Sequence, residues 1–169
     1  MMPSSKTRVL RCLGLVLPAL LAASVASATT ADLVRVNKTE AKLYLLQRGV
    51  VFASFHVAFG AHPQGPKTRQ GDGRTPEGRY LLDKRNPYSS FYKSLHVSYP
   101  NAEDRRRAAH LGVSPGGDIM VHGQPNGWGA YAAVTQQSNW TLGCIALSNE
   151  DMDVVWDSVP VGTPIEIDP

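Results

Sequence analysis

Short extended runs, each bounded by glycine, proline or asparagine, follow one another through most of the chain. The run from Val50 to Ala58 is rich in β-branched and aromatic residues, and Arg48-Gly49 joins it to the preceding run, a pattern typical of a β-hairpin. Strands are predicted at residues 32–36, 42–47, 50–58, 80–83, 95–98, 118–122 and 165–167. Because strands and helices do not alternate and no internal repeat is present, the pattern indicates a mainly β domain.

Two segments carry the signals of helix ends. Asn101 can cap a helix over residues 102–111, and Gly112 follows it, as the terminal chemistry of helices requires. Ser148 with Asp151 three residues later resembles a capping box and predicts a second helix. The sequence therefore predicts about two short helices beside the strands.

One long segment, residues 60–78, is rich in glycine, proline and basic residues and has no hydrophobic periodicity. Such a composition predicts a loop rather than a helix or strand. A loop of this length in a compact domain commonly contributes to binding or catalysis.

The first 28 residues have the order of features found in a signal peptide. Lys6, Arg8 and Arg11 precede an apolar run over residues 13–25, and Ala26-Ser27-Ala28 offers a cleavage site. An uncleaved membrane anchor is the alternative, but the run is shorter than the ~20 apolar residues of a spanning helix. We therefore expect cleavage, an exported domain over residues 29–169, and no later membrane span.

Charge gives no support to nucleic-acid binding. The chain has 17 basic and 14 acidic residues, but three of the basic residues lie in the predicted signal peptide, so the remainder is balanced. The cluster Arg105-Arg106-Arg107 is interpreted as the solvated face of a helix. A basic surface of the kind that binds nucleic acid is therefore not indicated.

Cys144 is the one cysteine outside the signal segment, because Cys12 lies within it. An unpaired thiol in an exported protein suggests a chemical role. His122 precedes Cys144 by 22 residues, and a neighbouring imidazole can activate a thiol that is mostly protonated at neutral pH. The carbonyl of Gly123 could orient the imidazole, and Gly143 would let backbone amides face an oxyanion. An inert cysteine at a strand bulge is the alternative, and a redox role would need a resolving cysteine.

Five motifs stand in a definite order along residues 32–167. They are Lys42-Leu43-Tyr44-Leu45, Gly71-Asp72-Gly73-Arg74-Thr75-Pro76-Glu77-Gly78, Ile119-Met120-Val121-His122-Gly123, Gly143-Cys144-Ile145 and Val161-Gly162-Thr163-Pro164-Ile165-Glu166-Ile167. In order and spacing they resemble the L,D-transpeptidase catalytic domain, the YkuD-like family. The stretch Trp140-Thr141-Leu142-Gly143-Cys144-Ile145-Ala146 resembles one branch of that family.

The resemblance implies a β-sandwich-like, cysteine-dependent acyltransferase in the periplasm or at the cell wall. Cys144 would be the nucleophile, His122 the base and the Gly123 carbonyl its orienter. The thiol would attack the third, diamino-acid residue of a peptidoglycan tetrapeptide stem, release D-alanine and form a thioester. The resemblance implies no metal or organic cofactor, and the sequence lacks a close pair of Cys or His ligands for zinc.

The group that accepts the acyl chain is left open. A second stem would give a cross-link, a protein lysine would give a wall-anchored protein, and water would make the enzyme an L,D-carboxypeptidase or hydrolase. A non-catalytic wall-binding module is a further alternative. The common family signature has a histidine and an arginine where this chain has Leu142 and Ala146, which removes a positioning hydrogen-bond donor and a cation beside the thiol.

Other residues are candidate contacts to the substrate. Arg74 and His96 are candidates on a loop and a strand, and Trp140, Thr141 and Leu142 precede the thiol directly. Each has a structural alternative, because the Arg74 loop could be a tight turn, His96 a satisfied sheet residue, and Trp140 an aromatic side chain packed under a loop.

Overall fold

The computed structural model describes residues 29–169, so the predicted signal peptide and Cys12 lie outside the described residues. The prediction of a mainly β fold is confirmed, with three short α-helices in the described part of the chain. The strands are β1 (Leu33–Asn37), β2 (Lys42–Gln47), β3 (Val50–His56), β4 (Gly78–Ser89), β5 (Tyr92–Val97), β6 (Met120–His122), β7 (Ile145–Ala146) and β8 (Thr163–Asp168). The helices are α1 (Ala102–His110), α2 (Ala132–Thr135) and α3 (Asn149–Ser158), and a 3₁₀ turn spans Gly129–Tyr131.

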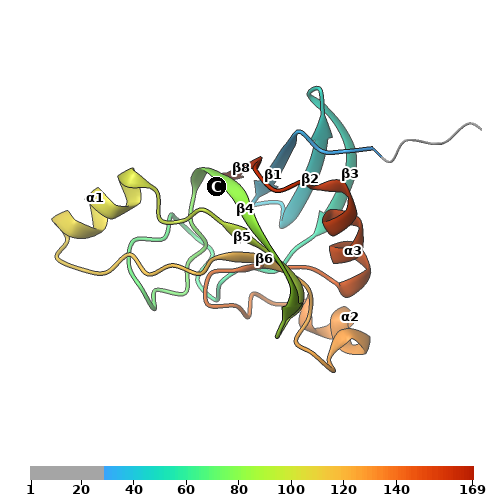
Figure 1. Ribbon diagram of the computed structural model, residues 1–169. Helices are drawn as coiled ribbons and strands as arrows, with labels where there is room; N and C mark the ends of the chain where they lie inside the picture. The colour runs from blue at the N-terminus through green and yellow to red at the C-terminus, as the bar shows by residue number, and fades with distance from the viewer. Residues whose placement is uncertain (1–28) are drawn as a thin grey trace, which may run out of the picture.

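The eight strands form one sheet in the order β3-β2-β1-β8-β4-β5-β6-β7. β1 pairs in parallel with β8, and β6 with β7, while the other pairs are antiparallel. Just beyond β3, Ala58 forms an antiparallel bridge with Ala146 of β7, so the two edges of the sheet meet. The sheet therefore curls around one core, to which both of its halves contribute side chains (Figure 1).

The turn between β2 and β3 shows why the sequence forms this hairpin. Arg48 and Gly49 both have positive φ, at 51° and 78°, and a two-residue loop with this backbone matches the right-handed twist of the paired strands. The expected hairpin is confirmed, with β3 ending at His56 rather than at Ala58.

Both predicted helices are present with their predicted caps. The Asn101 side chain accepts hydrogen bonds from the first turn of α1, and Asp104 completes a capping box. The Ser148 side chain accepts from the backbone of Asp151 at the start of α3, whose residues Met152 and Val155 are fully buried in the core. In Figure 1, α1 lies at one end of the molecule and α2 and α3 lie at the other.

β4 and β5 are longer than their sequence predicts. The polar stretch between the predicted strands at residues 80–83 and 95–98 forms most of a hairpin rather than a loop, with register shifts between Leu82 and Lys84 and between Asn86 and Ser89. Most of these residues are exposed, so the hairpin extends beyond the core and its side chains do not alternate between apolar and polar. The prediction for residues 60–78 is confirmed up to Glu77, since no named helix or strand lies between His56 and Gly78.

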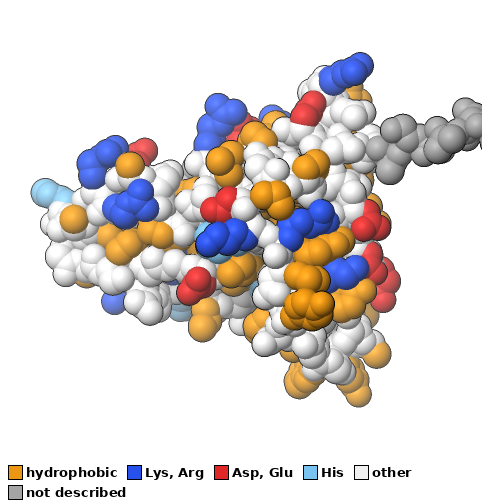
Figure 2. All heavy atoms as spheres, in the orientation of Figure 1, with side chains coloured by type: hydrophobic (Ala, Val, Ile, Leu, Met, Phe, Trp, Pro, Cys, Tyr) orange, Lys and Arg blue, Asp and Glu red, His pale blue; other side chains and the backbone are white. Residues whose placement is uncertain are grey.

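The charged surface agrees with the balanced composition of the described chain. On the face shown in Figure 2, basic side chains are interspersed with acidic and apolar ones. Arg105, Arg106 and Arg107 lie on α1, where Arg107 contacts Glu103 and Asp104. Among residues 29–169, none of the helices combines the length and the apolarity needed to cross a membrane.

Candidate active site

His122 is the last residue of β6 and is almost completely buried. Its Nδ1 lies 2.7 Å from the carbonyl oxygen of Gly123. Because a carbonyl can only accept, this contact places a proton on Nδ1 and leaves Nε2 of the neutral ring as the basic nitrogen. Burial lowers the pKa of His122 below its usual value of about 6.5, although the Gly123 contact acts in the opposite direction. The resting imidazole is therefore neutral at pH 7.

Gly123 holds its carbonyl in place at a crowded position. A Cβ there would lie 2.7 Å from Oδ1 of Asn149 and 2.9 Å from Cβ of Tyr92, both closer than side-chain atoms normally approach. The same Asn149 Oδ1 accepts a hydrogen bond from the backbone of Gln124 at 2.8 Å. The start of α3 thus fixes the backbone that orients His122.

Cys144 immediately precedes β7, the parallel neighbour of β6 in which Ala146 is paired with His122. The thiol is partly exposed, and Sγ lies 3.6 Å from the carbonyl oxygen of Asp118, to which it donates. Burial raises the pKa of the Cys144 thiol, while a hydrogen bond with the Met120 backbone and the charge of Lys67 oppose this effect without cancelling it. The resting pair is therefore a thiol and a neutral imidazole rather than a thiolate and an imidazolium.

The turn before Cys144 is shaped by Thr141 and Gly143. Oγ1 of Thr141 accepts from the amide of Gly143 at 3.0 Å and donates to the carbonyl of Cys144 at 2.8 Å. Gly143 has a φ of +132°, and a Cβ on it would lie 2.5 Å from the carbonyl oxygen of Arg74. The Gly143 amide is thus occupied, whereas the Cys144 amide has no acceptor among the described residues.

Cys144 and His122 line the same cavity, whose volume is about 740 Å³. Phe91 and Trp140 also line it, and both rings pack against the imidazole, with ring centroids 4.7 Å and 5.8 Å from that of His122. Nε1 of Trp140 is buried and has no acceptor among the described residues. Among the described residues, Trp140 therefore contributes ring contacts to the site, and its indole N–H is an unused donor.

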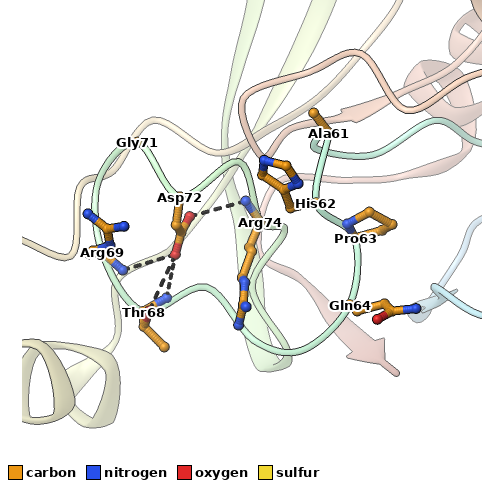
Figure 3. Close-up of a pocket in the computed structure, with 9 residues that line it drawn as sticks. All are labelled: Ala61, His62, Pro63, Gln64, Thr68, Arg69, Gly71, Asp72 and Arg74. Carbon is orange, nitrogen blue, oxygen red and sulfur yellow. Dashed lines mark hydrogen bonds between the residues drawn. The ribbon is translucent and has the colours of Figure 1, made fainter.

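The structure separates the predicted substrate contacts into two groups. Thr141 and Leu142 line the cavity with Trp140, and the Leu142 side chain is 84% exposed at its rim. Arg74 lines a different cavity of about 570 Å³ with His62 and Asp72 (Figure 3).

His96 does not line the Cys144 cavity, and its Nδ1 donates to Asp83 at 2.6 Å. Arg74 contributes only its backbone to the Cys144 turn. The substrate roles of both residues stay predictions without a contact to the Cys144 cavity.

Several lining residues were not candidates from the sequence. Phe91 and Ser94 come from the hairpin end and from β5, and Lys67 comes from the long loop. The aromatic content of the β4–β5 turn was visible in the sequence, but nothing in it indicated contact with His122. Within residues 29–169, no group of three His, Cys, Asp or Glu side chains is arranged to hold a metal ion.

Comparison with known proteins agrees with this geometry. A model of the YkuD family, the L,D-transpeptidase catalytic domain, matches residues 31–167. The chain is 38% identical over 97 residues to the putative L,D-transpeptidase YafK of Escherichia coli strain K12, which is 56% of this chain and 32% of that protein. The aligned part is thus about a third of the length of this curated relative.

Solved structures share the fold. The helical cell shape determining protein Pgp2 from Campylobacter jejuni superposes with a TM-score of 0.60 and 25% identity over 80% of this chain and 46% of that chain. Bd1075 of Bdellovibrio bacteriovorus gives a TM-score of 0.56 and 23% identity over 82% and 48% of the two chains. An L,D-transpeptidase from Mycobacterium smegmatis gives 0.54 and 18% over 81% and 58%. The last two support the fold alone, whereas the family match covers nearly all of the described residues, so the chain belongs to the L,D-transpeptidase catalytic domain family.

Proposed function

We propose that this protein is a peptidoglycan L,D-transpeptidase that transfers a stem peptide through a thioester on Cys144. The observation that carries the proposal is the 2.7 Å contact between Nδ1 of His122 and the Gly123 carbonyl, because it leaves Nε2 as a base in the cavity that holds the thiol. The family to which the chain belongs gives the reaction class, and among its relatives Pgp2 determines helical cell shape and YafK is a putative L,D-transpeptidase.

In the proposed first step, His122 takes the thiol proton while Sγ forms a bond to the carbonyl carbon of the third, diamino-acid residue of a tetrapeptide stem. The bond from that carbon to the nitrogen of D-alanine then breaks, and His122 returns the proton to the departing amine. A neutral imidazole and a neutral thiol suit this order of steps, since the imidazole must be unprotonated before it can accept the thiol proton.

The developing oxyanion needs hydrogen-bond donors that are not already used. Thr141 occupies the Gly143 amide, so we assign the Cys144 amide as the oxyanion donor from this turn. Gly143 then acts by its shape, since only a residue without Cβ fits beside the Arg74 carbonyl. Phe91 and Trp140 would support the imidazolium that forms during transfer, because aromatic faces attract cations.

In the second step an amine attacks the thioester and gives a proton to His122, and the thiolate departs and receives that proton from His122. The amine would belong to a second stem or to a lysine of a protein attached to the wall, and water at the same position would give hydrolysis. Because this substrate lies outside the cytoplasm, the proposal includes export by residues 1–28. N-terminal sequencing of the mature protein would then begin at Thr29.

Intact-protein mass spectrometry tests the proposal. Tetrapeptide muropeptides should add the mass of the tripeptide acyl group to the protein and release D-alanine. Cys144→Ser should abolish the adduct, and His122→Gln should slow its formation about a hundredfold or more, in the range of general-base catalysis. Adduct formation at an unchanged rate in His122→Gln would refute the assigned base.

The same incubation with a labelled amine identifies the acceptor. Cross-linked, amine-tagged and trimmed products differ in mass, so their ratio measures transfer to amines against transfer to water. Trimmed product alone, at saturating amine, would replace transpeptidation with hydrolysis as the activity. Failure of Cys144 to form any adduct would refute both.

A further inference from the structure

Lys67 is an ammonium group in the wall of the Cys144 cavity. Its side chain is 4% exposed, and Nζ lies 2.8 Å from Oδ1 of Asp72. Among the described residues that line this cavity, Lys67 is the one lysine or arginine. A buried cation that faces a reaction cavity is costly unless it is paired, so its partners decide what it can bind.

The partners of Lys67 leave part of its binding capacity unused. An ammonium has three N–H bonds, and Asp72 is the one acceptor of Lys67 among residues 29–169. A second buried lysine provides the contrast, because Nζ of Lys38 reaches Glu77 and the carbonyls of Gly65 and Thr75. Lys38 is therefore saturated, whereas Lys67 keeps two N–H bonds for a further acceptor.

Asp72 holds the ammonium in place. Its carboxylate accepts from Lys67 and from the backbone amides of Thr68, Arg69 and Arg74, and Figure 3 shows these three backbone segments around it. Burial alone would raise the pKa of Asp72, but these hydrogen bonds lower it to about 2. Asp72 is thus ionised across the physiological range, and its charge is shared among these donors and the Thr68 hydroxyl.

We propose that Lys67 is a substrate-binding residue whose two unused N–H bonds receive a carboxylate of the acyl-donor stem peptide in the Cys144 cavity. This inference rests on the proposed function. The stem offers two sources of that chemistry, the terminal carboxylate of D-alanine and the side-chain carboxylate of a diaminopimelate-type third residue. A charge-assisted hydrogen bond is shorter and stronger than a neutral one, so Lys67 would fix the stem relative to the thiol.

The electrostatic field at the thiol is consistent with this placement. Burial, the largest effect, raises the pKa of Cys144, the charge of Lys67 lowers it, and the charge of Asp118, which also lines the cavity, raises it. Arg74 and Arg69 line the neighbouring cavity and not this one. The cation available to a carboxylate beside Cys144 is therefore Lys67.

The first test needs no stem peptide. Iodoacetate and iodoacetamide alkylate thiols through similar chemistry, but only iodoacetate carries a carboxylate. The measured quantity is the rate constant for iodoacetate divided by that for iodoacetamide at Cys144, normalised by the same ratio for a free cysteine peptide. In the wild type this normalised ratio should be about ten, since a charge-assisted hydrogen bond of ordinary strength gives a factor of that size. Lys67→Met should return this normalised ratio to about one.

Two matched variants control for structure and for distant charge. Lys38→Met removes a buried lysine with saturated hydrogen bonds, and Arg69→Met removes an exposed cation from the same loop. Both should keep the wild-type ratio. If Lys67→Met does not fold, Lys67→Met/Asp72→Asn removes both charges together, which buried ion pairs tolerate better, and should also lose the ratio. An unchanged ratio in a folded Lys67 variant would overturn the proposal.

The second test identifies the carboxylate and separates this inference from the proposed function. Stems ending in D-alaninamide, or carrying an amidated third residue, each remove one source. Lys67→Met should raise KM for the natural stem about tenfold with a smaller change in kcat, and it should have no effect on the amidated stem that lacks the bound carboxylate. Equal losses on all stems would overturn the role of Lys67. Absence of wild-type adduct with every stem would instead refute the proposed function.

Discussion

The carbonyl oxygen of Arg74 lies 2.5 Å from the position that a Cβ on Gly143 would occupy. The long loop over residues 60–78 therefore supports the Cys144 turn through its backbone. Gly60 shows the same close packing, because a Cβ on it would lie 2.1 Å from the carbonyl oxygen of Gly73 and 3.0 Å from the Gly143 nitrogen. Two backbone segments distant in sequence are in contact where the thiol is held.

Gly143→Ala should therefore impair catalysis more than stability. The new Cβ must displace either the Arg74 carbonyl or the turn, and a misplacement of about 1 Å at a reacting group can cost about a hundredfold in rate. We expect thioester formation, followed by mass spectrometry, to slow by that factor.

The control for this variant is Gly49→Ala. Gly49 has a φ of +78° and nothing within 4 Å of its Cβ position, so the variant measures the cost of positive φ alone. It should form the thioester at the wild-type rate. Equal rates for Gly143→Ala and the wild type would show that the packing against Arg74 does not position the thiol.

Thr141→Val should reduce the rate of acylation while Thr141→Ser restores it. The hydroxyl bridges the Gly143 amide and the Cys144 carbonyl, and valine keeps the shape of threonine without either hydrogen bond. Each hydrogen bond is worth about 1 kcal/mol, so loss of both should slow the rate by roughly thirtyfold. Single-turnover kinetics would measure it, and a serine variant as slow as the valine variant would contradict the hydrogen-bonding role.

Local signals in the sequence predicted the elements whose ends carry their own chemistry. Arg48-Gly49 predicted a turn between two extended runs, and both residues have positive φ in the structure. Asn101 predicted α1 because its side chain caps the first turn. β4 and β5 were predicted too short, since the outer half of β4 is mostly exposed and the first residues of β5 are half-buried, so neither shows an apolar–polar alternation. Where a strand extends beyond the core, its side chains do not alternate between buried and exposed, so its sequence has no apolar–polar alternation to detect.

The sequence predicted the site residues whose side-chain chemistry implies a reaction. It did not predict the residues that belong to the site only because the fold places them in the cavity. A thiol and an imidazole at strand ends indicated a shared site, and the structure places Cys144 and His122 in one cavity. The long loop offered several cations, and Arg74 was the predicted substrate contact, yet Lys67 is the one that lines the cavity. The reason is that Asp72 gathers the loop backbone around itself, and this long-range arrangement has no periodic signal.

The pH dependence of acylation should be displaced toward acid on its lower limb. Burial lowers the pKa of His122, so the base stays unprotonated below pH 6.5, and the rate should begin to fall only beneath that value. Burial raises the pKa of the Cys144 thiol, so alkylation by iodoacetamide should still increase above pH 9, where a free cysteine peptide approaches its plateau. An acid limb centred above pH 6.5 would contradict the burial of His122.

Asp72 should make stability depend on pH in the acid range. Its folded pKa of about 2 lies below the unfolded value of about 3.9, so its contribution is complete above about pH 5 and is lost progressively as pH falls through 3.9 and then through 2. A difference of nearly two pKa units corresponds to roughly 2 kcal/mol of unfolding free energy, measured by urea unfolding between pH 2 and pH 7. Asp72→Asn should be less stable than the wild type at pH 7 by at least this amount, with the difference shrinking toward pH 2. Asp118→Asn, which alters an exposed carboxylate with no hydrogen bond to a described residue, should retain the wild-type profile, and a constant deficit of Asp72→Asn at all pH values would show that the carboxylate charge is not the cause.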